Sequence, residues 1–228
     1  MLPPQRPAVR AVVFDHDGTL VDTVRADFLS CSALFEEYGA PLPARRWAAE
    51  VCGHPDGYDR LLAMLHALGG PPVAALRVRL ESHWERFFTP EHIRLLPGVR
   101  ELLDALRADG ARLAVASAAD GPWVGRWLTH FSIADRFEAV VTGDQVPFRK
   151  PHPAVYLEAA ARLGVPPEEC AAVEDSITGV AAARAAGMTV IAVPTELTRH
   201  CDFTGAHHLL PGMAALKALA WLRPGTAR

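Results

Sequence analysis

The sequence is poor in lysine and in long apolar runs, and it has no long run of basic residues. Only two of its 23 basic residues are lysines, Lys150 and Lys217. The net charge is −3 and no Lys/Arg run exceeds two residues, so we expect no nucleic-acid partner. No apolar segment approaches the roughly 18 residues that cross a bilayer, and the N-terminus lacks the apolar core of a signal peptide. We therefore expect no membrane association.

Closely spaced cysteines are also missing. The chain has four cysteines and no C-x-x-C pair, which favours reduced thiols and a cytoplasmic location. Apolar residues make up 50% and charged residues 21%, as in ordinary globular proteins. A chain of 228 residues is long enough for one large domain and a small one. We expect a monomer or a small homo-oligomer.

Short apolar runs recur along the chain, most of them followed by a polar residue. Segments of helical period separate the later runs, and strands alternating with helices predict a doubly wound parallel α/β sheet. The expected strands are Ala11–Phe14, Leu113–Ala116, Ala139–Val141, Ala171–Val173 and Val190–Val193.

One region breaks this alternation. Between about Arg25 and His92 the chain has only helix-like patterns, such as Phe28–Tyr38, Tyr58–Leu68 and Val73–Phe88. We interpret residues 25–92 as a helical cap inserted into a Rossmann-like catalytic core formed by residues 1–24 and 93–228. A helical unit that begins beside a reaction site is well placed to exclude water.

Two carboxylates, Asp15 and Asp17, follow the first run and precede Gly18. Side chains alternate along a strand, so both can face one cleft while His16 points the other way. Ligands of open α/β sheets bind at this carboxyl edge, and crowded carboxylates require a compensating cation. The pattern predicts a hard-metal site, although turn aspartates before a glycine are common in loops.

Two more polar residues follow later strands. Ser117 comes after Leu113–Ala116, where a serine most often caps a helix but can also offer its hydroxyl and N–H to a phosphate oxygen. Lys150 precedes Pro151, which favours an extended conformation, and its ammonium suits a point-charge contact with phosphate. Considered singly, Ser117 is expected to be a cap and Lys150 a solvated loop cation.

A second pair of acids, Glu174 and Asp175, ends another apolar run. Acids at a helix start also stabilise the helix dipole, which is the simpler interpretation of this pair. However, both residues fall at the same sheet edge as Asp15 and Asp17. A third carboxylate there completes the oxygen ligands expected for Mg²⁺.

Together and in this order, these motifs resemble those of the haloacid dehalogenase superfamily, in its β-phosphoglucomutase-like phosphatase subfamily. The resemblance covers nearly the whole core, and the insertion is similar to that superfamily's type 1 cap. The motifs that carry it are Asp15-His16-Asp17-Gly18-Thr19, Ser117, Lys150-Pro151, Glu174-Asp175-Ser176, Gly179-Val180 and Ala185-Ala186-Gly187-Met188.

The resemblance implies a role for each motif. Asp15 would be the nucleophile that becomes an aspartyl phosphate. Asp17 would protonate the leaving oxygen and then deprotonate the attacking water. Ser117 and Lys150 would bind the transferring phosphoryl oxygens.

The resemblance also implies Mg²⁺ as the cofactor. The metal would be held by Asp15, the Asp17 carbonyl and Asp175, while Glu174 would orient metal-bound water or serve as a further ligand. The implied function is a Mg²⁺-dependent phosphatase acting on a small phosphorylated metabolite, with sugar phosphates as the natural class.

Other reactions of the superfamily fit less well. Dehalogenases lack the second acid, which is present here as Asp17. Phosphonate-cleaving relatives use a cap lysine, and residues 25–92 contain none. A non-catalytic phosphometabolite-binding protein would normally show a broken nucleophile, acid or metal ligand, and none is broken here.

A phosphomutase similar to β-phosphoglucomutase is the remaining alternative. In those enzymes a cap-hinge histidine follows the first motif, and the corresponding position is Asp27. Their cap arginine that grips a distal phosphate falls near Asp56, although Arg60 or Arg45 could supply that charge. We expect cap residues to set the substrate, with His54, Asp56, Tyr58 and Trp47 facing the cleft and Trp123 lining it from the core.

Overall fold

The computed structural model describes residues 9–219, so the ends of the expected core, residues 1–8 and 220–228, lie outside the described part. Six parallel strands form one sheet in the order β3-β2-β1-β4-β5-β6. The strands are β1 (Ala11–Phe14), β2 (Arg112–Ala116), β3 (Ala139–Val141), β4 (Cys170–Glu174), β5 (Thr189–Ala192) and β6 (His208–Leu209). The doubly wound parallel α/β fold expected from the sequence is confirmed.

Strand β1 lies at the centre of this sheet, and all four of its residues are fully buried. Its last residue, Phe14, is in register with Val115 of β2 and Val173 of β4. The carboxyl ends of the three strands therefore lie side by side, which brings the polar residues that follow each of them to one edge.

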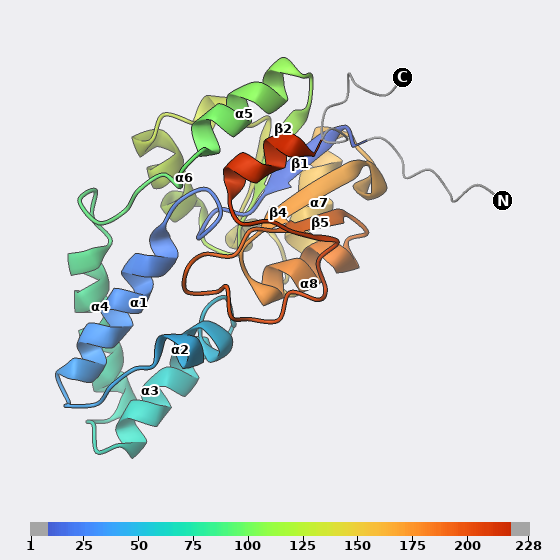
Figure 1. Cartoon of the computed structure of the whole chain (residues 1–228). Helices are drawn as coiled ribbons and strands as arrows, with labels where there is room; N and C mark the ends of the chain where they lie inside the picture. The colour runs from blue at the N-terminus through green and yellow to red at the C-terminus, as the bar shows by residue number, and fades with distance from the viewer. Residues whose placement is uncertain (1–8, 220–228) are drawn as a thin grey trace.

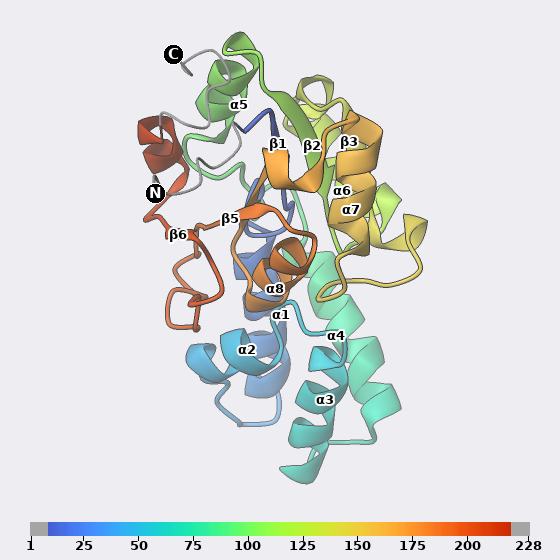
Figure 2. The same ribbon diagram turned by 90° about the vertical axis from the view of Figure 1, so that its right-hand side faces the viewer.

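Four helices cover the two faces of the sheet (Figures 1 and 2). Helices α5 (Val99–Ala108) and α6 (Gly121–His130) pack on one face through Leu103 and Trp127. On the other face lie α7 (Ala154–Leu163) and α8 (Ile177–Ala185). Short 3-10 turns connect these elements at η1 (Ala134–Arg136), η2 (Gly143–Gln145), η3 (Pro167–Glu169) and η4 (Met213–Ala218).

The remaining helices form a group beyond the carboxyl edge of the sheet (Figures 1 and 2). They are α1 (Thr23–Glu36), α2 (Ala44–Glu50), α3 (Gly57–Ala67) and α4 (Val73–Phe87). These four helices share an apolar cluster of their own, which includes Leu34, Leu62 and Leu80. They are called the cap below, and the division of the chain at residues 25 and 92 stays a prediction.

Three elements differ from the sequence-based expectation. Helix α2 has only seven residues, too few to show a clear period. Helix α6 carries Gly121, Pro122 and Gly125, which are weak helix formers. The two-residue strand β6 begins at His208 and is not among the strands expected from the sequence. Among the described residues, no helix is long and apolar enough to span a membrane.

Candidate active site

The carboxyl edge of the sheet gathers the residues singled out in the sequence. Asp15 directly follows β1, and its N–H donates to the carbonyl of Val173 at 3.0 Å. Asp175 directly follows β4, and Lys150 reaches the same place from the loop between β3 and α7. Their side chains are nearly inaccessible to solvent. Three residues that are far apart in sequence therefore form one buried charged cluster.

Lys150 joins two of the carboxylates. Its Nζ lies 2.5 Å from Asp15 Oδ1 and 2.6 Å from Glu174 Oε1. Burial alone lowers the pKa of Lys150, but the two carboxylates outweigh it, so that the pKa is raised above its usual value. Lys150 is thus a fixed ammonium beside Asp15, and not the solvated loop cation expected from the isolated residue.

Glu174 is saturated with hydrogen-bond donors. Its Oε1 accepts from Lys150 and from the Tyr156 hydroxyl, at 2.6 Å each. Its Oε2 accepts from the N–H of Asp175 at 3.1 Å, and from the N–H and hydroxyl of Ser176 at 3.2 and 3.0 Å. A Cβ on Gly179 would overlap this carboxylate, so the helix start must carry a glycine here. These contacts hold Glu174 in place as the partner of Lys150.

Asp175, in contrast to Glu174, has an oxygen without a hydrogen-bond donor among the described residues. Its side chain is 1% exposed, yet its Oδ2 has no hydrogen-bond partner among the described residues. Carboxylate oxygens of Asp15, Glu174 and Asp175 lie within 4.8 Å of one another. Gly18 has a φ of +84°, and a Cβ there would overlap the Asp175 carboxylate. The backbone at Gly18 therefore lies close to the Asp175 carboxylate, whose Oδ2 has no donor among the described residues.

The charges in this cluster do not balance. Three carboxylates face one ammonium, and burial raises the pKa of Asp15 to about 7. Burial, together with the charges of Asp15 and Glu174, raises the pKa of Asp175 well above its usual value. A divalent cation bound by these oxygens would favour both ionised forms. The donor set therefore fits a hard cation such as Mg²⁺.

Asp17 has a different set of partners. Its Oδ1 accepts from the Thr23 hydroxyl at 2.7 Å and from the Trp123 indole N–H at 2.9 Å. His16 Nδ1 lies 3.2 Å from its Oδ2. Although burial raises the pKa of Asp17, the neighbouring His16 and the hydrogen bonds from Thr23 and Trp123 lower it to about 2. The carboxylate of Asp17 is not among the clustered metal-binding oxygens.

The chain is similar over most of its length to known hydrolases. Residues 12–193 match the family model for haloacid dehalogenase-like hydrolases. The chain belongs to the haloacid dehalogenase-like hydrolase family. It is 34% identical over 186 residues to a phosphoglycolate phosphatase from Nitrosococcus oceani, a match that covers 79% of this chain and 81% of that protein.

Solved structures of two relatives extend the similarity over almost the full length. A haloacid dehalogenase family hydrolase from Deinococcus radiodurans, with bound phosphate and sodium, is 30% identical with a TM-score of 0.78, covering 97% of this chain and 99% of that chain. CbbY from Rhodobacter sphaeroides, in complex with xylulose 1,5-bisphosphate, is 29% identical with a TM-score of 0.73, covering 94% of this chain and 99% of that chain.

In this hydrolase Ser117 does not cap a helix. Ser117 directly follows β2 and is buried, and its Oγ accepts a hydrogen bond from the N–H of Ala119 at 3.0 Å. Helix α6 begins later, at Gly121, and its N-cap residue is Asp120. The interpretation of Ser117 as an N-cap is therefore wrong. Phosphate binding by Ser117 stays a prediction.

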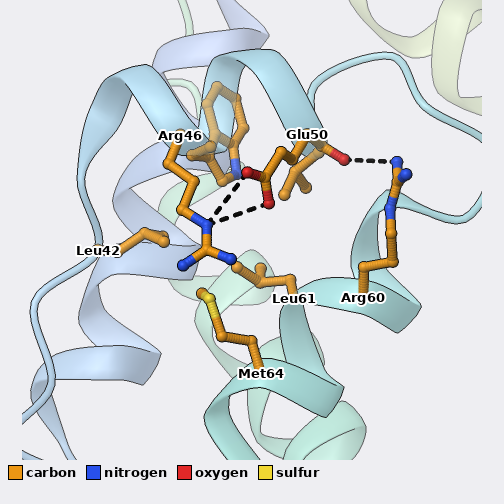
Figure 3. A pocket seen from close by; sticks show the side chains of 8 residues that line it. Leu42, Arg46, Glu50, Arg60, Leu61 and Met64 are labelled. Atoms are coloured by element: carbon orange, nitrogen blue, oxygen red, sulfur yellow. Dashed lines mark hydrogen bonds and ion pairs between the residues drawn. The ribbon is translucent and has the colours of Figure 1, made fainter.

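The cap residues divide into two groups. Asp56 is largely exposed and lies 3.2 Å from Arg60, which also donates to the Glu50 carbonyl at 2.7 Å (Figure 3). Arg60 is thus engaged by residues of the cap itself, beside a cavity of about 180 Å³ between α2 and α3. Trp47, expected to face the cleft, is fully buried in the cap core.

The other group lies closer to the site. His54 belongs to the loop in which Gly53 accepts a 2.8 Å hydrogen bond from Thr178 of α8, and its neighbour Pro55 borders a groove of about 580 Å³ beside Lys150. Tyr58 donates to Asp27 at 2.5 Å. The cap therefore contacts the catalytic core at the start of α8.

Sequence reasoning missed several partners of the site. Tyr156 and Thr23 carry no motif, because their hydroxyls matter only for the carboxylates that the fold places opposite them. Trp84 of the cap donates to Asp27 at 2.8 Å, which no spacing rule predicts. Trp123 was expected only to line the cleft, and its N–H in fact contacts Asp17.

Proposed function

We propose that this protein is a Mg²⁺-dependent phosphatase that hydrolyses a small phosphorylated metabolite, a sugar phosphate by class, through an aspartyl phosphate on Asp15. The observation that carries the proposal is the pairing of Asp15 with Lys150 beside the unpartnered oxygen of Asp175. A phosphate dianion approaches a carboxylate only where positive charge offsets the repulsion. The phosphate bound in the relative from Deinococcus radiodurans supports a phosphate site in this fold.

In the first step an Asp15 oxygen attacks phosphorus and the bond from phosphorus to the leaving oxygen breaks. Lys150, which contacts Asp15, would offset the charge between Asp15 and the phosphoryl oxygens, and the hydroxyl of Ser117 would donate to those oxygens. Asp17 gives its proton to the leaving oxygen. Although its pKa is about 2 in the free protein, a phosphate dianion nearby raises it and favours the protonated acid.

In the second step water attacks the phosphorus of the aspartyl phosphate, Asp17 takes the water proton, and phosphate and free Asp15 result. Asp15, Asp175 and the Asp17 carbonyl would hold Mg²⁺, which when bound supplies charge stabilisation to the phosphoryl oxygens. Glu174 holds Lys150 in position through its 2.6 Å contact.

Water is favoured over a sugar hydroxyl as the phosphoryl acceptor. Asp27 is the position that corresponds to the hinge histidine of the mutases, and as an acidic residue hydrogen-bonded to Tyr58 and Trp84 it cannot supply an imidazole there. Arg60, the candidate handle for a second phosphate, is bound to the Glu50 carbonyl and to Asp56. These contacts argue against a bisphosphate intermediate.

Phosphate release from a panel of sugar phosphates and other small phosphomonoesters, with Mg²⁺ and with EDTA, tests the proposal. We expect metal-dependent turnover that Asp15→Asn abolishes. The control Asp104→Asn, which changes an exposed carboxylate on α5, should keep full activity. Conversion of β-glucose 1-phosphate with a trace of bisphosphate, and no phosphate release, would instead establish a mutase.

A further inference from the structure

Three cap helices converge on one carboxylate that the proposed mechanism does not use. Asp27 of α1 accepts the Tyr58 hydroxyl of α3 at Oδ2 and the Trp84 indole N–H of α4 at Oδ1, at 2.5 and 2.8 Å. The rings of Tyr58 and Trp84 meet edge to face, with centroids 5.0 Å apart. The carboxylate is therefore fixed by neutral donors and lies among aromatic rings.

This carboxylate lies toward the reaction site. Asp27 is four residues after Thr23, so the two share a face of α1, and Thr23 donates to Asp17. The Trp84 ring is stacked on Phe88, and Phe88 packs against Trp123, which also donates to Asp17. The charge of Asp17 reaches Asp27 and adds to the effect of burial on its pKa. Asp27 thus lies one helical turn beyond Thr23, the residue that donates to Asp17.

The contacts of Asp27 supply no positive charge. Its hydrogen-bond donors in the described structure are the neutral side chains of Tyr58, Trp84 and, more weakly, Cys31. Several cap arginines are engaged elsewhere, in the pairs Arg46–Glu50, Arg60–Asp56, Arg77–Asp59 and Arg79–Glu37. Arg46 and Arg60 line the cavity of Figure 3. An ionised Asp27 therefore places an uncompensated negative charge near Asp17, the proposed general acid.

We propose that Asp27 is a specificity-determining residue that accepts a hydroxyl of the leaving group and rejects a second anionic group. The two fixed donors leave carboxylate lone pairs free for a hydroxyl, whereas a phosphate or carboxylate beside Asp27 meets like charge in a partly desolvated place. The enzyme then prefers monophosphates of neutral polyols and sugars to bisphosphates and phosphocarboxylic acids. This inference rests on the proposed phosphatase activity.

The test compares kcat/KM within matched pairs of substrates that differ in one charged group. Glycerol 3-phosphate against 3-phosphoglycerate exchanges a hydroxymethyl for a carboxylate, and fructose 1-phosphate against fructose 1,6-bisphosphate adds a phosphate. In the wild type we expect the neutral member of each pair to be favoured at least about tenfold, and Asp27→Asn to reduce that ratio about tenfold, chiefly through KM of the charged member.

Two controls keep the test decisive. Asp59→Asn removes an exposed carboxylate of α3, next in sequence to Tyr58 and paired with Arg77, and should leave the ratio unchanged. If Asp27→Asn does not fold, Asp27→Ser is measured instead, and the wild-type ratios stand as a test of their own.

The outcomes separate the two proposals. Phosphate release that is equal for both members of each pair, or a ratio unchanged by loss of the Asp27 charge, overturns the inference and leaves the phosphatase proposal intact. If no substrate releases phosphate, the proposed function fails, and this inference fails with it.

Discussion

The indole N–H of Trp123, on α6 of the core, lies 2.9 Å from Oδ1 of Asp17 and shares that oxygen with the Thr23 hydroxyl. Thr23 begins the first cap helix, and Trp123 packs edge to face on Phe88, the residue that follows the last cap helix. The orientation of the proposed acid is therefore tied to both connections between cap and core.

This relationship predicts the effect of Trp123→Phe. Loss of one hydrogen bond to a charged group costs about 1.5–3 kcal/mol, so we expect kcat/KM for alkyl phosphates to fall about 10- to 100-fold. For p-nitrophenyl phosphate the fall should be much smaller, because its leaving group needs little protonation. The matched control is Trp127→Phe, since the Trp127 N–H has no partner among the described residues. An equal loss on both substrate types would contradict a role through Asp17.

Tyr156→Phe should destabilise the protein and weaken catalysis. The change removes a donor from Glu174 Oε1 in a fully buried place, at a cost of about 1–3 kcal/mol in the free energy of unfolding. Because Glu174 holds Lys150, we also expect a lower kcat. Urea unfolding and steady-state kinetics measure both effects. Tyr38→Phe, on the cap surface, serves as the control, and equal stability of the two variants would refute the prediction.

Mg²⁺ should raise the melting temperature by binding to the carboxylate cluster. A ligand that binds only the native state stabilises it in proportion to RT ln(1 + [L]/Kd). We expect the rise to be reversed by EDTA and to disappear in Asp175→Asn, which removes the charge beside the unpartnered oxygen. Asp202→Asn, at an exposed turn far along the chain, should keep the rise. A rise that persists without the Asp175 charge would place the cation elsewhere.

The stability of the cap should depend on pH through Asp27. Burial raises the pKa of Asp27 from 3.8 to about 6, so between these values the native state holds a proton that the unfolded state has released. Native stability therefore falls as pH rises through this window. Relative to Asp27→Asn, the wild type should lose at most about 3 kcal/mol between pH 4 and 7. Urea unfolding at several pH values measures this difference, and a flat difference would contradict the shift.

Two helix glycines should respond in opposite ways to alanine. In α6, a Cβ on Gly125 meets nothing within 4 Å, so Gly125→Ala should stabilise the protein by about 0.5–1 kcal/mol. In α8, a Cβ on Gly179 would overlap Glu174 Oε1, so Gly179→Ala should destabilise the protein and lower activity. Thermal unfolding and phosphate release measure both variants, and a gain in stability for Gly179→Ala would show that Glu174 can move without loss.

The core strands and the polar edge were predictable because their signals are local. The run Ala11–Phe14 is uniformly apolar because it is buried on both faces, and the acids after β1 and β4 necessarily share an edge in a parallel sheet. Helix α7 ends at Gly164 with a φ of +60°, as the sequence pattern indicates. Short or glycine-containing elements such as α2 and α6 lack such signals, and the two-residue β6 exists only by pairing with β5.

The sequence was sufficient to predict the fold class, the family resemblance and the acidic and basic residues at the carboxyl edge of the sheet. These features depend on residue types and periodic patterns within short stretches of the chain. The tertiary structure alone decided which partners those residues have. It joined Tyr156 to Glu174, Trp123 to Asp17, and both Tyr58 and Trp84 to Asp27, and it turned Arg60 away toward Glu50. The reason is physical, since a hydrogen bond depends on distance and direction in space, and residues up to 135 positions apart in the chain meet at this site only after folding.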